Sequence, residues 1–217
     1  MIYTSSHNNW ETDLYKTYAI SGNRGKDANY KGKYYQPLAP KLSFWKVWHD
    51  NIGKIPEEEN NKYYIQKYWE DVLSKLDPET VYQDLNYSVL LCYETNEKFC
   101  HRHIVAAWFE LVLGEEIPEI KLKNNEIEYL DRPKYIKQHL EDIIRTSKNM
   151  RGFKSLRALF LFEKAERLEE KANILEKQNK NNCEIYRQAA CDIRCEADEE
   201  ESKYIKKILK KTNSNLI

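Results

Sequence analysis

The sequence predicts an α/β fold, with a small, mostly parallel sheet and flanking helices, followed by an all-helical C-terminal extension. Short β-prone runs alternate with helical spacings over the first 120 residues, as in parallel α/β sheets. Residues 156–209 contain no Gly or Pro and are rich in Glu, Lys, Arg and Ala, which favours long helices. We therefore expect an α/β domain at 1–120 and a charged helical extension, forming a hairpin, at 121–217.

The first elements follow from local pattern. Residues 2–4 and 18–21 are short runs rich in β-prone residues, which predicts two strands. The Gly- and Pro-rich stretch 22–40 predicts a loop. Residues 60–76 repeat apolar side chains at helical spacing, which predicts an amphipathic helix. Another short helix should begin at Asp77-Pro78-Glu79, because Asp favours the cap position and Pro the first helical position.

The later elements are a strand, a helix, a second strand and a helical region. The apolar run at 88–92 predicts a buried parallel strand, and 101–113 predicts a helix that ends at Gly114. Residues 116–120 predict a final strand at the sheet edge, where Pro118 is tolerated. Helical spacing then returns, and the extension is expected to contain three helices, at 131–144, at 156–175 and from 184 onward, with a polar break at 179–182.

Composition and charge exclude some classes of protein. Lys and Arg total 35, as do Asp and Glu, so the chain is not the strongly basic domain typical of nucleic-acid binding. The neutral sum is a cancellation: residues 1–120 carry 13 basic and 18 acidic residues, whereas 121–217 carry 22 and 17. No stretch approaches the roughly 20 apolar residues that span a membrane, so no membrane partner is expected.

The five Cys residues are an odd number, and no secretory signal is visible at the N-terminus. They therefore indicate reduced thiols, and we expect a cytoplasmic location.

The segment from Cys92 to His103 is the most informative for function. It reads Cys92-Tyr93-Glu94, a short gap, and then Cys100-His101-Arg102-His103. Ligands of parallel sheets bind where the strands end, and a helix N-terminus attracts anions. A Cys at a helix start beside His and Arg should have a lowered pKa, which makes it a better nucleophile.

Three interpretations of this segment stay open. In the first, Cys100 is a nucleophile or anion contact, His101 and Glu94 handle protons, and Arg102 holds an anion. In the second, Cys92, Cys100, His101 and His103 bind zinc, although their spacing departs from the usual zinc motifs, so we predict no cofactor. In the third, these residues only pack, since Cys is among the most buried residue types.

The paired motif resembles the family called domain of unknown function 488. Its members show a strand ending in Leu-Leu-Cys-x-Glu, here residues 90–94, followed by Cys-His-Arg at a helix start, here 100–102. The resemblance covers about residues 1–120 and leaves 121–217 unmatched. It implies an α/β fold and a cytoplasmic setting, and it implies no particular reaction.

A second segment, Gly22-Asn23-Arg24-Gly25-Lys26, lacks the glycine spacing of a phosphate-binding P-loop. It nevertheless follows a predicted strand, so it should face the same pocket. We expect several residues to contact the ligand there, with the tyrosines able to stack on a nucleotide. These predicted ligand-binding residues are Ser21, Asn23, Arg24, Lys26, Tyr34, Tyr35, Cys92, Tyr93 and Arg102.

The sequence favours an enzyme that acts on a phosphorylated or nucleotide-like anionic ligand, with Cys100, His101 and Glu94 as catalytic residues. A Cys-nucleophile transferase or hydrolase fits this pattern. The alternative is a non-catalytic module that binds a nucleotide or nucleic acid. A third hypothesis is an adaptor that recruits a protein partner through residues 155–217.

Overall fold

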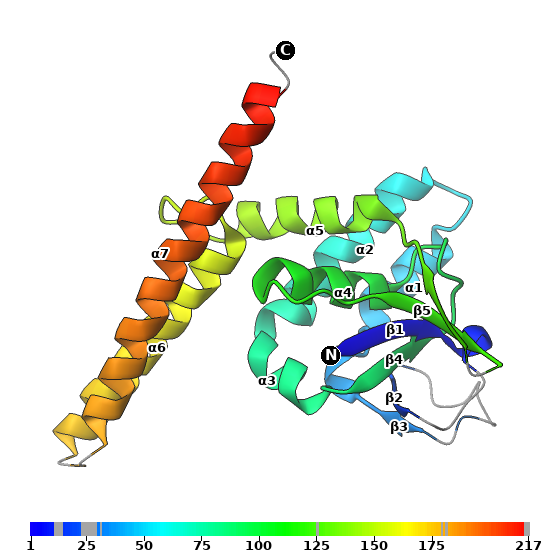
Figure 1. Cartoon of the computed structure of the whole chain (residues 1–217). Helices are drawn as coiled ribbons and strands as arrows, with labels where there is room; N and C mark the ends of the chain where they lie inside the picture. Colours follow the sequence, from blue (N-terminus) through cyan, green and yellow to red (C-terminus); the bar gives the residue numbers. More distant parts are fainter. Residues whose placement is uncertain are drawn as a thin grey trace. The chain divides into compact units, whose positions relative to one another are not determined.

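The computed structural model describes residues 1–10, 15–22, 30, 32–124, 126–178, 180 and 182–214. It contains two compact units, Met1–Ser147 and Lys148–Ile217 (Figure 1). The first unit therefore extends beyond residue 120, where the sequence predicts the boundary of the domain. The reason is that the segment after residue 120 adds a strand to the sheet and a helix, α5 (Lys134–Ser147), that packs against two helices of the same unit.

The first unit is built on one sheet of six strands in the order β3-β2-β4-β1-β5-β6. Every neighbouring pair is parallel except β5 and β6, which are antiparallel. The prediction of an α/β fold with a mostly parallel sheet is thus confirmed. The strands are β1 (Ile2–Ser6), β2 (Lys16–Ala19), β3 (Lys33–Tyr34), β4 (Ser88–Cys92), β5 (Glu119–Lys123) and β6 (Glu126–Leu130).

Strand β4 lies at the centre of the described sheet, and all five of its residues are buried. Its uninterrupted apolar run fits this central position, where all five side chains are shielded from water. The register pairs Ser6, the last residue of β1, with Cys92, the last residue of β4. The ends of these two strands therefore lie side by side.

Strand β5 differs from its prediction. The sequence predicts an edge strand at 116–120, but the strand begins at Glu119, directly after Pro118, and lies between β1 and β6. Pro118 lies outside the ladder, and its carbonyl accepts a hydrogen bond from the Thr4 amide at 2.9 Å. The edge position belongs to β6, which has mostly exposed residues.

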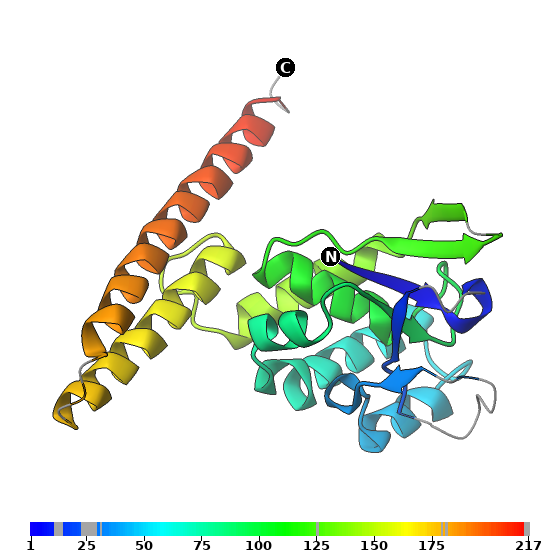
Figure 2. The same ribbon diagram turned by 60° about the horizontal axis from the view of Figure 1, so that its bottom comes forward.

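The helices of the first unit gather on one face of the sheet, where α4 contacts β1 and β4 (Figures 1 and 2). Helix α4 is buried along most of its length, whereas the amphipathic α2 buries Tyr64, Ile65, Tyr68 and Trp69. The α-helices are α1 (Leu42–Asp50), α2 (Glu57–Asp71), α3 (Pro78–Asp84), α4 (His101–Val112) and α5. The three short 3-10 helices are η1 (His7–Asn9), η2 (Gln36–Leu38) and η3 (Leu73–Lys75).

The second unit is a helical hairpin of α6 (Leu156–Lys177) and α7 (Cys183–Ser214), as the sequence predicts. The Ser155 side chain caps α6 by accepting a hydrogen bond from the Ala158 amide. Both helices bury alanines: Ala158, Ala165 and Ala172 on α6, and Ala190 and Ala197 on α7. Among the described residues, no helix is both long and apolar enough to cross a bilayer.

Candidate functional site

The thiols of Cys92 and Cys100 and the imidazole of His101 form a buried cluster where β4 ends and α4 begins. Cys92 is the last residue of β4, Cys100 is the N-cap of α4, and His101 is its first residue. One ligating atom from each of the three lies within 4.8 Å of the others. Their exposed fractions are 4%, 3% and 7%, so the cluster is screened from water. The eight-residue connection from strand end to helix start brings these groups together.

The contacts of His101 fix the orientation of its ring. Its Nε2 lies 3.0 Å from the carbonyl oxygen of Ile20, which can only accept, so Nε2 carries a proton. Its Nδ1 lies 3.5 Å from the Cys92 Sγ. The imidazole is thus held by Ile20, the residue that follows β2, and faces the thiols through Nδ1.

The two thiols have opposite pKa shifts. The hydrogen bond to Cys100, followed by burial, raises the pKa of Cys92 well above its ordinary value. Burial alone would raise the pKa of Cys100, but the hydrogen bond from Cys92, the charge of Arg102 and the contact with His101 together lower the pKa of Cys100 well below its ordinary value. These shifts favour ionisation of Cys100 before Cys92.

Arg102 is fully buried and is held by Glu119, at the start of β5. Its Nε donates to both Glu119 carboxylate oxygens at 3.1 and 3.2 Å, and its Nη2 donates to Oε1 at 2.9 Å. His103 Nε2 lies 3.6 Å from Glu119 Oε2. Burial opposes ionisation of Glu119, but His103 and Arg102 outweigh it and lower the pKa of that carboxyl group. Arg102 is therefore occupied on one side, and its Nη1 has no hydrogen-bond partner in the described part of the chain.

Two buried hydroxyls near the cluster also lack partners. Within the described ranges, Ser6 Oγ and Ser21 Oγ make no hydrogen bond. Ser6 pairs in register with Cys92, and Ser21 follows Ile20, whose carbonyl holds His101. Buried polar groups are nearly always hydrogen-bonded in folded proteins, so three unsatisfied atoms around one cluster indicate a place for a bound polar group or water.

The side chains of other residues singled out in the sequence make contacts outside the cluster, or the residues lie outside the described part of the chain. Glu94 is exposed in the turn after β4 and has no hydrogen bond with the cluster. Tyr35 donates a hydrogen bond to Asp84 Oδ2 at 2.9 Å, on α3. The ring of Tyr93 packs against His7, with centroids 5.2 Å apart. The ring of Tyr34 packs against Tyr30, with centroids 5.6 Å apart. Asn23, Arg24 and Lys26 lie outside the described residues.

The cluster has a donor set that can hold a metal ion. Two thiolates and one imidazole with an open fourth position occur in catalytic zinc sites. The Nε2–H bond from His101 to a backbone carbonyl is the outer contact that ligating histidines usually make. His103 is not part of this set, because it lies against Glu119.

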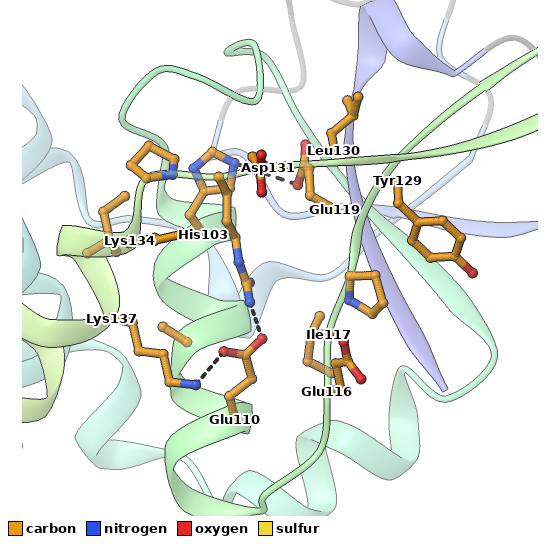
Figure 3. A pocket seen from close by; sticks show the side chains of 15 residues that line it. His103, Glu110, Glu116, Ile117, Glu119, Tyr129, Leu130, Asp131, Lys134 and Lys137 are labelled. Atoms are coloured by element: carbon orange, nitrogen blue, oxygen red, sulfur yellow. Dashed lines mark hydrogen bonds and ion pairs between the residues drawn. The ribbon is translucent and has the colours of Figure 1, made fainter. Parts of the chain in front are cut away.

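A cavity of about 370 Å³ lies between α4, β5 and the start of α5 (Figure 3). His103 and Glu119 are at one end of it and Glu110 and Lys137 at the other. Sequence reasoning did not assign a role to Glu119. The sequence did contain a signal: Glu119 is an acidic residue between the apolar Pro118 and Ile120, at the start of a strand.

Comparison with known proteins identifies a family but no named relative. A family model described as the active DUF488-N3 subclade matches residues 3–112, just over half of the chain. That range includes all of β1 except Ile2, the strands β2 to β4 and α4, and with them the whole cluster. No curated protein and no solved structure matches the chain. The chain belongs to the active DUF488-N3 subclade, within domain of unknown function 488.

Proposed function

We propose that the chain is an enzyme that acts on a phosphorylated or nucleotide-like anionic ligand at the end of the sheet, with the Cys100 thiolate as its nucleophile. The observation that carries this proposal is the position of Cys100 at the N-cap of α4, clustered with Cys92 and His101. These neighbours and the charge of Arg102 lower the pKa of Cys100. A thiolate is the reactive form of cysteine, and at ordinary pKa values only a small fraction of a thiol is ionised at neutral pH.

The ligand class is supported by the polar atoms around the thiolate. Arg102 Nη1 and the hydroxyls of Ser6 and Ser21 are buried donors without partners in the described part of the chain. The first turn of α4 contains no acidic residue, so its partial positive charge is not offset by a carboxylate. Hydroxyl, guanidinium and helix N-terminus all favour an acceptor-rich anion such as a phosphate group.

The proposed reaction has two steps. The Cys100 Sγ electron pair forms a bond to an electrophilic phosphorus or anomeric carbon of the ligand. The bond from that atom to its leaving group breaks, and the leaving group departs with the electron pair. Water or an acceptor hydroxyl then attacks the same atom, the bond to Sγ breaks, and the thiolate is restored. In this second step a neutral His101 accepts at Nδ1 the proton that the attacking water or hydroxyl loses.

The test uses the full chain with p-nitrophenyl phosphate and with adenosine mono-, di- and triphosphate as probes. We expect one probe to be turned over, and intact-protein mass spectrometry to show a covalent adduct of one phosphoryl or glycosyl group. Cys100→Ser should retain ligand binding but lose both turnover and adduct. Cys191→Ser removes an exposed thiol of α7 and is the matched control. It should behave as the wild type.

Two results would contradict the proposal. If Cys100→Ser turned over substrate at the wild-type rate, Cys100 would not be the nucleophile. If the wild type bound adenosine phosphates but converted neither them nor p-nitrophenyl phosphate, the site would be a non-catalytic binding module. In that case affinity should fall steeply as salt concentration rises.

A further inference from the structure

We infer that Cys92, Cys100 and His101 form a zinc site that regulates the chain by blocking Cys100. Binding of the metal depends only on the three side chains and their surroundings. The regulatory effect rests on the proposed function, because it requires Cys100 to be the nucleophile.

The three donor atoms are already grouped closely enough for one ion. One ligating atom of each residue lies within 4.8 Å of the others. Around a tetrahedral zinc ion, two sulfurs are about 3.8 Å apart and a sulfur and a nitrogen about 3.6 Å apart. The distance from Cys92 Sγ to His101 Nδ1 is 3.5 Å. Small movements of these side chains therefore suffice to place all three around one zinc ion.

The surroundings of His101 are those of a zinc ligand. Ligating histidines usually donate their other N–H to a carbonyl or carboxylate group, which fixes the ring. Here Nε2 lies 3.0 Å from the carbonyl oxygen of the fully buried Ile20, and Nδ1 is the nitrogen that faces Cys92. A neutral His101 then offers the lone pair of Nδ1 to the metal.

A partner for a fourth ligand lies next to Cys92. Ser6 is paired with Cys92 in register, and its buried Oγ has no hydrogen bond in the described part of the chain. Register partners on parallel strands present their side chains to the same face of the sheet. A water molecule at the fourth position of the metal can therefore use Ser6 as its hydrogen-bond partner.

Charge balance at the buried cluster favours a divalent cation. Zinc binding displaces the protons of Cys92 and Cys100, so two thiolate charges offset the two charges of the ion. The charge of the nearby Arg102 is offset by Glu119, whose Oε1 lies 2.9 Å from Nη2. The loaded cluster is thus neutral overall, which suits residues that are only 3% to 7% exposed.

The cysteines of the helical hairpin supply the control. Cys191 and Cys195 are exposed on α7, and Cys183 at its start is partly exposed. Within the described ranges, none of them belongs to a group of three clustered ligating side chains. Replacing all three by Ser should therefore leave the zinc site intact.

Zinc titration of the full, reduced and metal-free chain, in competition with the chromophoric chelator zincon, tests the site. We expect the Cys183→Ser/Cys191→Ser/Cys195→Ser variant to bind one zinc ion per chain. Adding Cys92→Ser should weaken binding by roughly a hundredfold or more, since even the loss of an outer contact costs about ten- to a hundredfold. Tryptophan fluorescence checks that this variant folds. If it does not, Co²⁺ bound to the triple variant decides, because thiolate ligation gives charge-transfer absorption in the near ultraviolet.

Three results would overturn the inference: no zinc binding to the triple variant, unchanged affinity after Cys92→Ser, or cobalt binding without thiolate absorption. Turnover separates the zinc site from the proposed reaction. If the triple variant converts a probe but binds no zinc, the zinc site fails alone; if it binds zinc but converts no probe, the proposed reaction fails alone. Where both occur, one equivalent of zinc should abolish turnover and EDTA should restore it. Turnover that persists with zinc bound would refute the regulatory effect.

Discussion

Replacing Glu119 by Gln tests whether the buried ion pair with Arg102 holds α4 against β5. Both side chains are fully buried, and three N–H···O contacts of 2.9 to 3.2 Å join them. Gln has nearly the same volume as Glu, so the change removes the charge without creating a cavity. It leaves the guanidinium buried without a counterion, which costs about 3–5 kcal/mol in comparable pairs.

The measurement is the free energy of unfolding in guanidinium chloride, followed by tryptophan fluorescence. All five Trp residues precede residue 110, so the signal reports the first unit and not the helical hairpin. We expect Glu119→Gln to lower this free energy by about 3–5 kcal/mol. An Arg102→Met/Glu119→Leu double variant should recover most of the loss, because two apolar residues leave no buried charge unpaired.

Two outcomes would refute this reasoning. A loss below about 1 kcal/mol would place the pair in the range of solvent-exposed ion pairs. A double variant no more stable than Glu119→Gln would show that the lost stability does not come from the unpaired Arg102.

Three further predictions concern the first unit. Asp77→Ala removes the cap of α3, where Oδ1 accepts from the Thr80 amide at 2.9 Å, and should cost about 0.5–2 kcal/mol in the same unfolding assay; no change would mean that the cap contributes nothing. Tyr68→Phe leaves the buried Leu38 carbonyl without its 2.5 Å hydrogen bond and should cost about 1–3 kcal/mol, while a neutral result would imply that water replaces the hydroxyl. Because the pKa of Glu119 is lowered in the folded state, its stabilisation is complete above the pKa of an unfolded Glu and is lost as pH falls through the folded value. Unfolding free energies measured between neutral and acid pH should therefore fall less steeply in the Arg102→Met/Glu119→Leu variant than in the wild type; equal slopes would contradict this assignment.

Local patterns predicted most of the fold. The apolar run of β4 and the helical spacings of α2, α4 and the hairpin depend on neighbours in the chain, so they can be read before the tertiary structure is known. Two predictions were wrong: the domain does not end at residue 120, and residues 116–120 do not form an edge strand. Strand order decides both, since β6 pairs with β5 and α5 packs on α2 and α4.

The candidate site, like the fold, could be predicted only in part from the sequence. The cluster of Cys92, Cys100 and His101 could be anticipated, because one short connection joins the end of β4 to the start of α4. The hydrogen bond from His101 to the Ile20 carbonyl and the occupation of Arg102 by Glu119 could not. Their partners come from other strands, and nothing in the local sequence of α4 specifies them.

The sequence by itself determined an α/β unit with a thiol, an imidazole and a guanidinium at a strand end, followed by a helical hairpin. The tertiary structure decided which thiol has the lower pKa and which side chain already has a buried partner. Cys100 has a lowered pKa because Cys92 and Arg102 lie beside it, and Arg102 is engaged because strand order brings Glu119 to it. Periodicity and chain connectivity act over a few residues, whereas charge state depends on burial and on neighbours that only packing brings together.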